Sequence, residues 1–225
     1  MYIAIEASHA NKEHRTGVEE YCWQIIQELK KIVPSGVRVI LYSNEPLRGE
    51  LAEMPTNWNV KVLRWPFRKL WSQIRLSWEF IFYPPDIFFA PGQLVPIICP
   101  KNTIVMIHDS AFKAYPHAYR FCGRQYLKWM NRLIIRKAKV ILTSTEFNKR
   151  ELMKFYGNEV SEKIVVVPLA YDKNKFFNVI LNEAPTKSGR SEESLVCQPY
   201  IISIGRLEEK KNTKRIIQAF NLLRS

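Results

Sequence analysis

Short apolar runs alternate with longer segments of helical periodicity as far as about residue 168. The short runs are rich in β-branched and aromatic residues and predict strands at residues 2–7, 37–42, 60–63, 86–90, 103–107, 140–143 and 164–167. Apolar residues spaced three and four apart predict helices at residues 16–33, 67–82, 118–137 and 145–156. Strands that alternate with helices of this length form right-handed βαβ units. The pattern therefore predicts an α/β fold, with a mostly parallel sheet and helices on both faces.

Two of these helices carry more specific predictions. Thr16 is followed by Glu19 three residues later, a capping box that is expected to start the first helix. By their spacing, Trp71 and Trp78 of the segment 67–82 are expected in the core. The whole segment has apolar residues at helical spacing along one side. They are Phe67, Leu70, Trp71, Ile74, Trp78 and Ile81.

The pattern changes after residue 170. Residues 171–199 are rich in polar residues without periodicity and are interpreted as a linker or insertion. A strand is expected at 200–204, followed by a helix with Asn212 as its N-cap. One strand and one helix cannot bury their own apolar faces. We therefore expect residues 1–170 to form one domain and residues 200–225 to be the start of a second, incomplete domain.

Parallel sheets bind ligands beyond the carboxyl ends of their strands. The segments that follow the predicted strands are 6–17, 91–96, 108–116 and 144–146, and Gly17, Gly92 and His108 lie in them. These three residues are expected to converge at one edge of the sheet. For Gly17 two explanations stay open: a turn that needs a positive φ, or a close approach of the backbone to a ligand.

The chain has 225 residues, 34 Lys plus Arg against 21 Asp plus Glu, and a net charge of +13. This excess favours an anionic partner, which could be nucleic acid, a phosphorylated substrate or an acidic membrane surface. The four cysteines have neither metal-site nor redox-pair spacing, which is typical of a reducing cytosol. Neither a bilayer-spanning segment nor a signal peptide is recognisable. The expected location is cytoplasmic.

One stripe of basic residues concentrates part of the positive charge. Its members are four residues apart on the helix predicted at 118–137, and they are Arg120, Arg124, Lys128, Arg132 and Arg136. Four residues correspond to slightly more than one helical turn, so the stripe drifts slowly around the helix. Two interpretations stay open, a solvated basic helix face or a surface that binds an anionic membrane.

Six segments carry a resemblance to a known family. In order along the chain they read RTGVE at 15–19, DIFFAP at 86–91, IHDSAF at 107–112, AKVILTSTEF at 138–147, KIVVVP at 163–168 and YIISIGRLEEKKN at 200–212. Their order and spacing resemble the retaining glycosyltransferases of family 4, also called group 1, which have the GT-B fold of two facing Rossmann-like domains. The chain departs from the family where Leu169-Ala170 replaces the usual Asn-Gly, and the paired-glutamate donor motif is absent.

The resemblance implies a function. It is the transfer of a hexose from a nucleotide-diphosphate sugar to a glycan or lipid-linked acceptor, in cell-surface polysaccharide synthesis. It implies that Arg206 and Lys211, with Gly17, bind the donor, and that neither a metal nor another cofactor is needed. The basic pair would stabilise the negative charge on the leaving diphosphate. A chain without the rest of the second domain is expected to be inactive on its own.

The same resemblance assigns residues to the first domain's side of the cleft. His108 would lie near the transferred sugar, with Asp109 as its orienting or acceptor-side neighbour. Thr16, Gly92 and Glu146 are the expected acceptor-side residues. The leaving phosphate can itself assist deprotonation of the acceptor, so a protein base is not required.

Other function classes fit the sequence less well. A basic binding module for nucleic acid or anionic membrane explains the charge but not the strand-end motifs, and no nucleic-acid-binding signature is present. The chain has neither a Walker A loop nor a GxGxxG fingerprint, which disfavours an NTPase or a dinucleotide oxidoreductase. The histidines lack the spacing of a metal-dependent phosphohydrolase. A catalytically dead fragment, or a half that needs a partner chain, stays open.

Overall fold

A computed structural model describes residues 1–67, 70–170 and 212–224. The chain divides into two compact units, Met1–Pro168 and Leu169–Ser225. The linker expected at 171–199 and the strand expected at 200–204 lie outside the described residues. In the second unit the structure describes one helix, α7 (Thr213–Arg224).

The first unit is built on a seven-stranded sheet in which all neighbouring strands are parallel. The strand order is β3-β2-β1-β4-β5-β6-β7. The strands are β1 (Tyr2–Glu6), β2 (Arg38–Ser43), β3 (Trp58–Val62), β4 (Ile87–Ala90), β5 (Thr103–Ile107), β6 (Val140–Thr143) and β7 (Ile164–Val166). Each lies at a predicted position, which confirms the α/β, Rossmann-like fold class.

Helices connect these strands. They are α1 (Gly17–Ile32), α2 (Leu76–Phe82), α3 (Ala111–Ala114), α4 (Phe121–Lys137) and α5 (Glu146–Tyr156). Shorter turns are η1 (Gly49–Ala52), η2 (Trp71–Arg75), η3 (Pro116–Ala118) and η4 (Asn158–Lys163). The predicted capping box of Thr16 and Glu19 starts α1.

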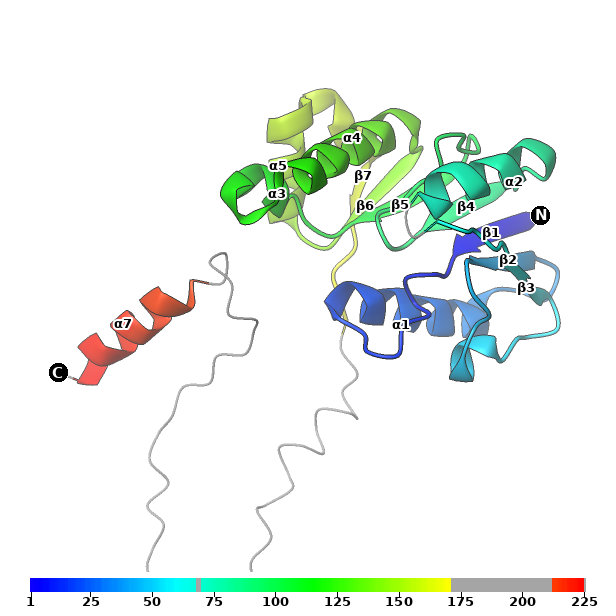
Figure 1. Cartoon of the computed structure of the whole chain (residues 1–225), viewed down its shortest axis with the longest axis horizontal. Coiled ribbons are helices and arrows are strands. Elements are labelled where there is room, and N and C mark those ends of the chain that lie inside the picture. The colour runs from blue at the N-terminus through cyan, green and yellow to red at the C-terminus, as the bar shows by residue number, and fades with distance from the viewer. Residues whose placement is uncertain (68–69, 171–211, 225) are drawn as a thin grey trace, which may run out of the picture. The chain divides into compact units, whose positions relative to one another are not determined.

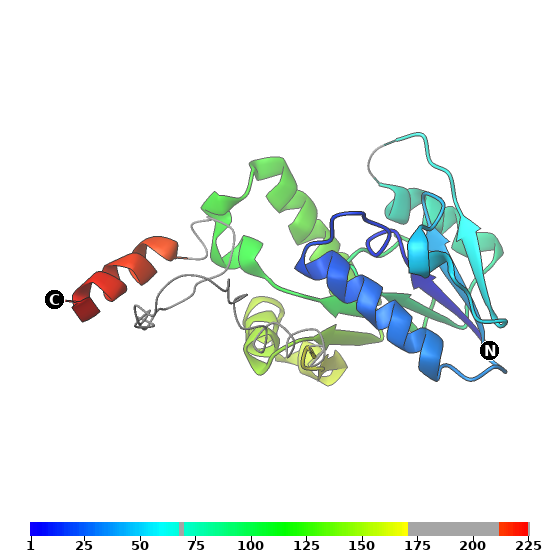
Figure 2. The same cartoon turned by 90° about the horizontal axis from the view of Figure 1, so that it is seen from below.

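The helices lie on both faces of the sheet, as predicted. Figures 1 and 2 show α1 on one face and α2 and α4 on the other. Cys22 and Ile26 of α1 belong to one buried cluster with residues of β1 and β2. Leu76 of α2 and Ile134 of α4 belong to a second cluster against the opposite face. The sheet is thus the middle of three layers, and the edge at which its strands end is available for a site.

The segment 67–82 differs from its prediction in both start and orientation. Leu70 has a left-handed backbone, with φ of 64°, and the helix begins only at the π-helical turn η2. Of this apolar side only Trp71 is in the core, so Trp78 does not lie where its spacing predicted. The others are exposed, namely Phe67, Leu70, Ile74, Trp78 and Ile81.

Polar contacts explain why this helix turns its polar side inward. Glu79 is only 4% exposed and pairs with Lys61 and Arg75. The buried hydroxyl of Ser77 accepts a hydrogen bond from the Ile98 amide at 3.1 Å. Because a buried polar group must be paired, these contacts fix the inner face. Apolar side chains that the helix period places opposite therefore point outward.

The second unit's helix also has an unexpected exposure. The apolar side chains of α7 include Ile216, Phe220 and Leu223, and all three are exposed. The carbonyl oxygen of Asn212 accepts hydrogen bonds from the Arg215 and Ile216 amides, so α7 starts where expected. No described helix is long and apolar enough to cross a membrane.

The contrast between two tryptophans tests this fold. Trp71 is buried and donates its indole N–H to the Leu63 carbonyl at 2.6 Å, whereas Trp78 is 61% exposed. We expect Trp71→Ala to lower the free energy of unfolding by about 3–5 kcal/mol. Trp78→Ala is expected to change it by less than about 0.5 kcal/mol. Urea denaturation of the two variants measures this, and equal losses would contradict the orientation of α2.

Candidate functional site

The strand order places one switch point in the sheet, between β1 and β4. From β1 the chain continues outward through β2 and β3, and from β4 it continues outward in the other direction through β5, β6 and β7. The loops that leave β1 and β4 therefore diverge and leave a crevice at the carboxyl edge. The side chains at the ends of β1, β4 and β5 meet there.

A buried carboxylate occupies the end of β1. Glu6 is 0% exposed, and its two oxygens have different partners. Oε1 accepts hydrogen bonds from the Ser8 amide, at 2.8 Å, and from the Ser8 hydroxyl. Oε2 lies 3.0 Å from Nδ1 of His9. The buried Glu6 and the partly buried His9 thus form a pair at the start of the loop after β1.

The contacts of this pair determine its charge state. Burial alone would raise the pKa of Glu6, but His9 and the hydrogen bonds from Ser8 outweigh it, so the pKa lies below its usual range. Burial would likewise lower the pKa of His9, but the Glu6 carboxylate outweighs it and raises the pKa. The two residues therefore stabilise each other as a carboxylate and an imidazolium.

His108 follows β5 and has the opposite tendency. Burial lowers the pKa of His108, although the Pro91 carbonyl and Asp109 act to raise it. Its Nε2 lies 2.8 Å from the carbonyl oxygen of Pro91, and because a carbonyl only accepts, Nε2 is the protonated nitrogen. Its ring stands edge-on to Tyr21 of α1, with 4.9 Å between ring centroids. His108 is therefore a neutral imidazole with Nδ1 as its acceptor nitrogen.

Gly92 brings the loop after β4 against His9. A Cβ at this position would lie 2.5 Å from Cγ and 2.6 Å from Nδ1 of the His9 ring. No side chain fits there, so the glycine allows the two loops to touch. The Pro91-Gly92 loop thus links His108, through the Pro91 carbonyl, to the Glu6–His9 pair.

Gly17 and Thr16 start α1 at the same edge, one turn before Tyr21. Gly17 does not have a positive φ, and a Cβ built on it would meet nothing within 4 Å. The first of its two explanations, a turn with positive φ, is therefore wrong. The Thr16 amide donates to the Glu19 carboxylate at 2.9 Å, so Thr16 has a capping role at this position.

Among the described residues, neither Asp109 nor Glu146 forms a hydrogen bond or ion pair with the His108 ring, and Asp109 acts on it through its charge. Asp109 is exposed, and its Oδ1 accepts a hydrogen bond from the Ala111 amide at 3.2 Å. Glu146 is the exposed first residue of α5. The residue of α5 that does reach His108 is Asn148. Its side-chain amide donates a hydrogen bond to the backbone carbonyl oxygen of His108 at 2.8 Å.

The remaining expected site residues, Arg206 and Lys211, lie outside the described residues. Within the described ranges, no group of three His, Cys, Asp or Glu side chains is arranged to hold a metal ion.

Two cavities flank the loop after β1. One has a volume of about 540 Å³ and extends from Ser8 and Asn44 to the start of α4 at Cys122 and Gly123, with Gln73 and Tyr126 also in its wall. The other, of about 550 Å³, lies between this loop and η1.

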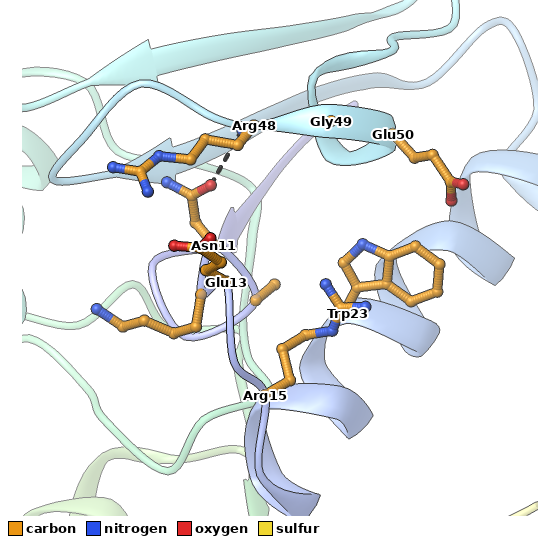
Figure 3. Close-up of a pocket in the computed structure, with 9 residues that line it drawn as sticks. Asn11, Glu13, Arg15, Trp23, Arg48, Gly49 and Glu50 are labelled. Carbon is orange, nitrogen blue, oxygen red and sulfur yellow. Dashed lines mark hydrogen bonds between the residues drawn. The ribbon is translucent and has the colours of Figure 1, made fainter.

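Figure 3 shows the side chains of the second cavity. Trp23 projects from α1 toward the η1 turn at Gly49 and Glu50. The Arg15 guanidinium lies 4.6 Å from the centroid of the Trp23 ring. The side chain of Asn11 accepts a hydrogen bond from the Arg48 amide at 3.1 Å. The wall of this cavity therefore combines an aromatic ring with charged and hydrogen-bonded polar groups.

Comparison with known proteins identifies the family. Residues 15–175, more than half of the chain, match the model of Glycosyltransferase Family 4. The chain belongs to glycosyltransferase family 4. The matched residues of this family 4 chain include the α1 start, the loop after β4, His108 and α5.

Individual relatives are more distant. The family 4 chain is 24% identical over 158 residues to the O-antigen chain mannosyltransferase B of Escherichia coli. That match covers 70% of this chain and 38% of the relative, so the chain spans well under half of the relative's length. A solved structure, that of Anabaena Alr3699/HepE in complex with UDP and glucose, is 14% identical to this chain, with a TM-score of 0.49. The match covers 76% of this chain and 45% of that chain.

Sequence reasoning missed Glu6, His9 and Asn148. Glu6 and His9 stand in the segment after the first strand that the topology marks for inspection, but His9 is considered there only as a metal ligand. A carboxylate as the last residue of an apolar central strand is a signal of a buried, paired acid. Asn148 lies one turn into a helix, and its link to His108 has no sequence signature.

The Glu6–His9 pair predicts a pH dependence of stability in the family 4 chain. The pKa of His9 is higher in the folded chain than its value of 6.5 in the unfolded chain. The stability that His9 contributes is therefore complete below pH 6.5 and is lost as the pH rises through the folded pKa. The pKa of Glu6 is lower in the folded chain than its value of 4.5 in the unfolded chain. The stability that Glu6 contributes is therefore present above pH 4.5 and is lost as the pH falls through the folded pKa. The pair therefore stabilises most between these values.

Glu6→Gln is expected to lower the free energy of unfolding by about 3 kcal/mol in that window. The loss shrinks toward alkaline pH, where His9 is neutral. Urea unfolding as a function of pH measures this, with Glu162→Gln, an exposed carboxylate, as the matched control. Parallel pH profiles for wild type and Glu6→Gln would show that no such pair exists.

Two glycine substitutions form a second matched test. Gly92→Ala is expected to destabilise the family 4 chain by about 1–3 kcal/mol, because its Cβ overlaps the His9 ring. Gly17→Ala is expected to change stability by less than about 0.5 kcal/mol, because its Cβ meets open space. Thermal unfolding measures both. A destabilising Gly17→Ala would mean that Gly17 is needed for folding instead of for a ligand.

Proposed function

We propose that this family 4 chain is the acceptor-side domain, with the start of the donor-side domain, of a retaining GT-B glycosyltransferase. The enzyme would transfer a hexose from a nucleotide-diphosphate sugar to a glycan or lipid-linked acceptor. The observation that carries the proposal is the meeting of His108 and the Glu6–His9 pair at the switch point of a family 4 domain.

The charge state of His9 suits the chemistry. Cleavage of the bond between sugar and diphosphate places negative charge on the leaving group. An imidazolium held by a buried carboxylate is a fixed cation at the cleft, and it is already oriented before the reaction. The ring N–H of His9 that does not face Glu6 would thus be an oriented hydrogen-bond donor beside the positive charge that we assign to Arg206 and Lys211.

The neutral His108 suits a different task. Its Nε2–H is bound to the Pro91 carbonyl, which fixes the ring orientation and leaves Nδ1 to accept a hydrogen bond. A sugar hydroxyl is a donor of the right kind. We assign His108 to positioning the transferred sugar, while the acceptor proton passes to the leaving phosphate. This scheme needs neither a protein base nor a metal ion or other cofactor.

The two flanking cavities suit the acceptor. The one at Trp23 has the aromatic and polar walls expected for a sugar ring, and the one at Gln73 and Tyr126 mixes polar and apolar walls. The Escherichia coli relative is named as an O-antigen chain mannosyltransferase, which supports a glycan acceptor and a role in polysaccharide synthesis. Thr16, Gly92 and Glu146 would border the acceptor, and Asp109 would stand beside it.

We also propose peripheral attachment to the cytoplasmic face of a membrane. The exposed apolar side chains of α2, with Trp78 and Phe82 among them, and the basic stripe on α4 together support a surface that enters an anionic interface. The rival function, a basic binding module without catalysis, would use the same surface but would not need a paired acid and two histidines at the switch point.

Turnover tests the proposed transfer. We expect the 225-residue chain alone to release no nucleoside diphosphate from a panel of nucleotide sugars with acceptor present, because donor and acceptor are held by opposite domains. Supplying a complete second domain, fused or in trans, is expected to restore release. Robust turnover by the short chain alone would overturn the domain assignment.

Variants of the completed enzyme test the assigned roles. Arg206→Ala and Lys211→Ala are each expected to lower kcat/KM by about 100-fold or more, because they remove charge that faces the leaving group. Arg136→Ala, an equal loss of charge on α4, is the control and should leave kcat/KM within about twofold. If the completed enzyme binds anionic vesicles but transfers no sugar from any donor, the binding-module function replaces the proposed one.

A further inference from the structure

A third cavity lies away from the switch point, among α3, α4 and α5. It has a volume of about 450 Å³. It is lined by Phe112, Lys113, Pro116, Arg124, Lys128, Arg132 and Phe155. Four of these seven residues are cations and none is an acid. The cavity shares no residue with the site at the switch point.

The four cations converge without a counterion among the described residues. Lys113, Arg124 and Lys128 are partly buried, and none of the four cations forms an ion pair with another described residue. Burial lowers the pKa of the Lys113 amine, and the charges of Arg132 and Lys128 lower it further. Like charges in a partly desolvated cavity destabilise the fold unless an anion neutralises them.

Two of the cations have polar atoms that no acidic side chain satisfies. Nε of Arg124 is buried and has no hydrogen-bond partner among the described residues. The Lys113 ammonium lies 3.7 Å from the centroid of the Tyr156 ring and 4.6 Å from that of Phe155. Ring faces attract a cation only weakly, so they hold Lys113 in place without neutralising it.

We infer that Lys113, Arg124, Lys128 and Arg132 form a binding pocket for a phosphoryl anion, such as a phosphate monoester or a diphosphate. A phosphate monoester carries up to two negative charges, a diphosphate can carry more, and both have several acceptor oxygens, which matches converging guanidinium and ammonium donors. A single carboxylate would leave most of the four charges uncompensated. The cavity volume is ample for a diphosphate.

The pocket changes the interpretation of the basic stripe on α4. Its central members, Arg124, Lys128 and Arg132, line the cavity, and Lys113 joins them from α3. Arg120 and Arg136, at the ends of the stripe, do not line it. On a flat basic face, all five stripe residues would contribute equally to anion binding. With a pocket, the three central residues contribute more than the two at the ends. The inference does not depend on sugar transfer.

Calorimetric titration of the full chain with inorganic pyrophosphate tests the pocket. Wild type is expected to bind, and Lys128→Gln is expected to weaken binding by about tenfold or more, because it removes a charge-assisted hydrogen bond. The matched control is Arg136→Gln, which removes the same charge from the same helix outside the cavity and should change affinity by less than about twofold. Pyrophosphate should also raise the Tm of wild type and of Arg136→Gln, but not that of Lys128→Gln.

A second arm distinguishes the source of the phosphoryl group. Co-sedimentation compares vesicles of phosphatidylcholine alone with vesicles that contain phosphatidylglycerol. Vesicle binding that falls more for Lys128→Gln than for Arg136→Gln assigns the pocket to a lipid headgroup. Pyrophosphate binding with equal vesicle binding of both variants assigns it to a soluble phosphate. Absence of pyrophosphate binding together with no difference on vesicles, or equal weakening by the two variants, would overturn the inference.

Discussion

The fully buried carboxylate of Glu6 constrains the whole carboxyl edge of the sheet. An ionised acid at the end of a central strand is stable only if hydrogen bonds and a cation replace its water. Ser8 and His9 supply both, which fixes the path of the loop after β1. The His9 ring then occupies the space into which a side chain at position 92 would project. The adjacent Pro91 carbonyl in turn orients His108. One desolvated charge thus determines the arrangement of three loops.

The two clusters of charged residues in the first unit differ in how they are neutralised. At the switch point, acid and base are paired within the chain, so the charge there is fixed before any ligand binds. Among α3, α4 and α5, the cations form no ion pair with another described residue, and an added anion would relieve their mutual repulsion. The first arrangement is suited to orienting a reaction, and the second is suited to capturing a partner.

Helix α2 shows how a few polar contacts can decide which face of a helix is buried. Its sequence has enough apolar residues for two faces, and both could be buried by hydrophobicity alone. The ion pairs of Glu79 with Lys61 and Arg75 and the bond from Ile98 to Ser77 decide which face turns inward. The consequence is an apolar outer surface, with Trp78, that is available for a membrane or another partner.

The sequence by itself determined the order of strands and helices, because apolar periodicity and capping residues act over a few neighbouring positions. The parallel strands, the start of α1 at Thr16 and the edge that carries Gly17, Gly92 and His108 follow from this local information. The sequence predicts Gly92 at that edge, but the reason for a glycine there is the His9 ring, which only the structure brings against it.

Only the tertiary structure decided the pairings between distant segments. The contact of Asn148 with His108 spans forty residues along the chain, and the bond from His108 to Pro91 spans seventeen. The protonation states of His9 and His108 follow from such contacts, since burial and neighbouring charge are set by packing. So does the difference between a stripe and a pocket on α4, because Lys113 joins the cluster only when α3 folds against α4. The periodicity of a sequence shows which side chains share a helix face. It does not show which distant segment packs against that face.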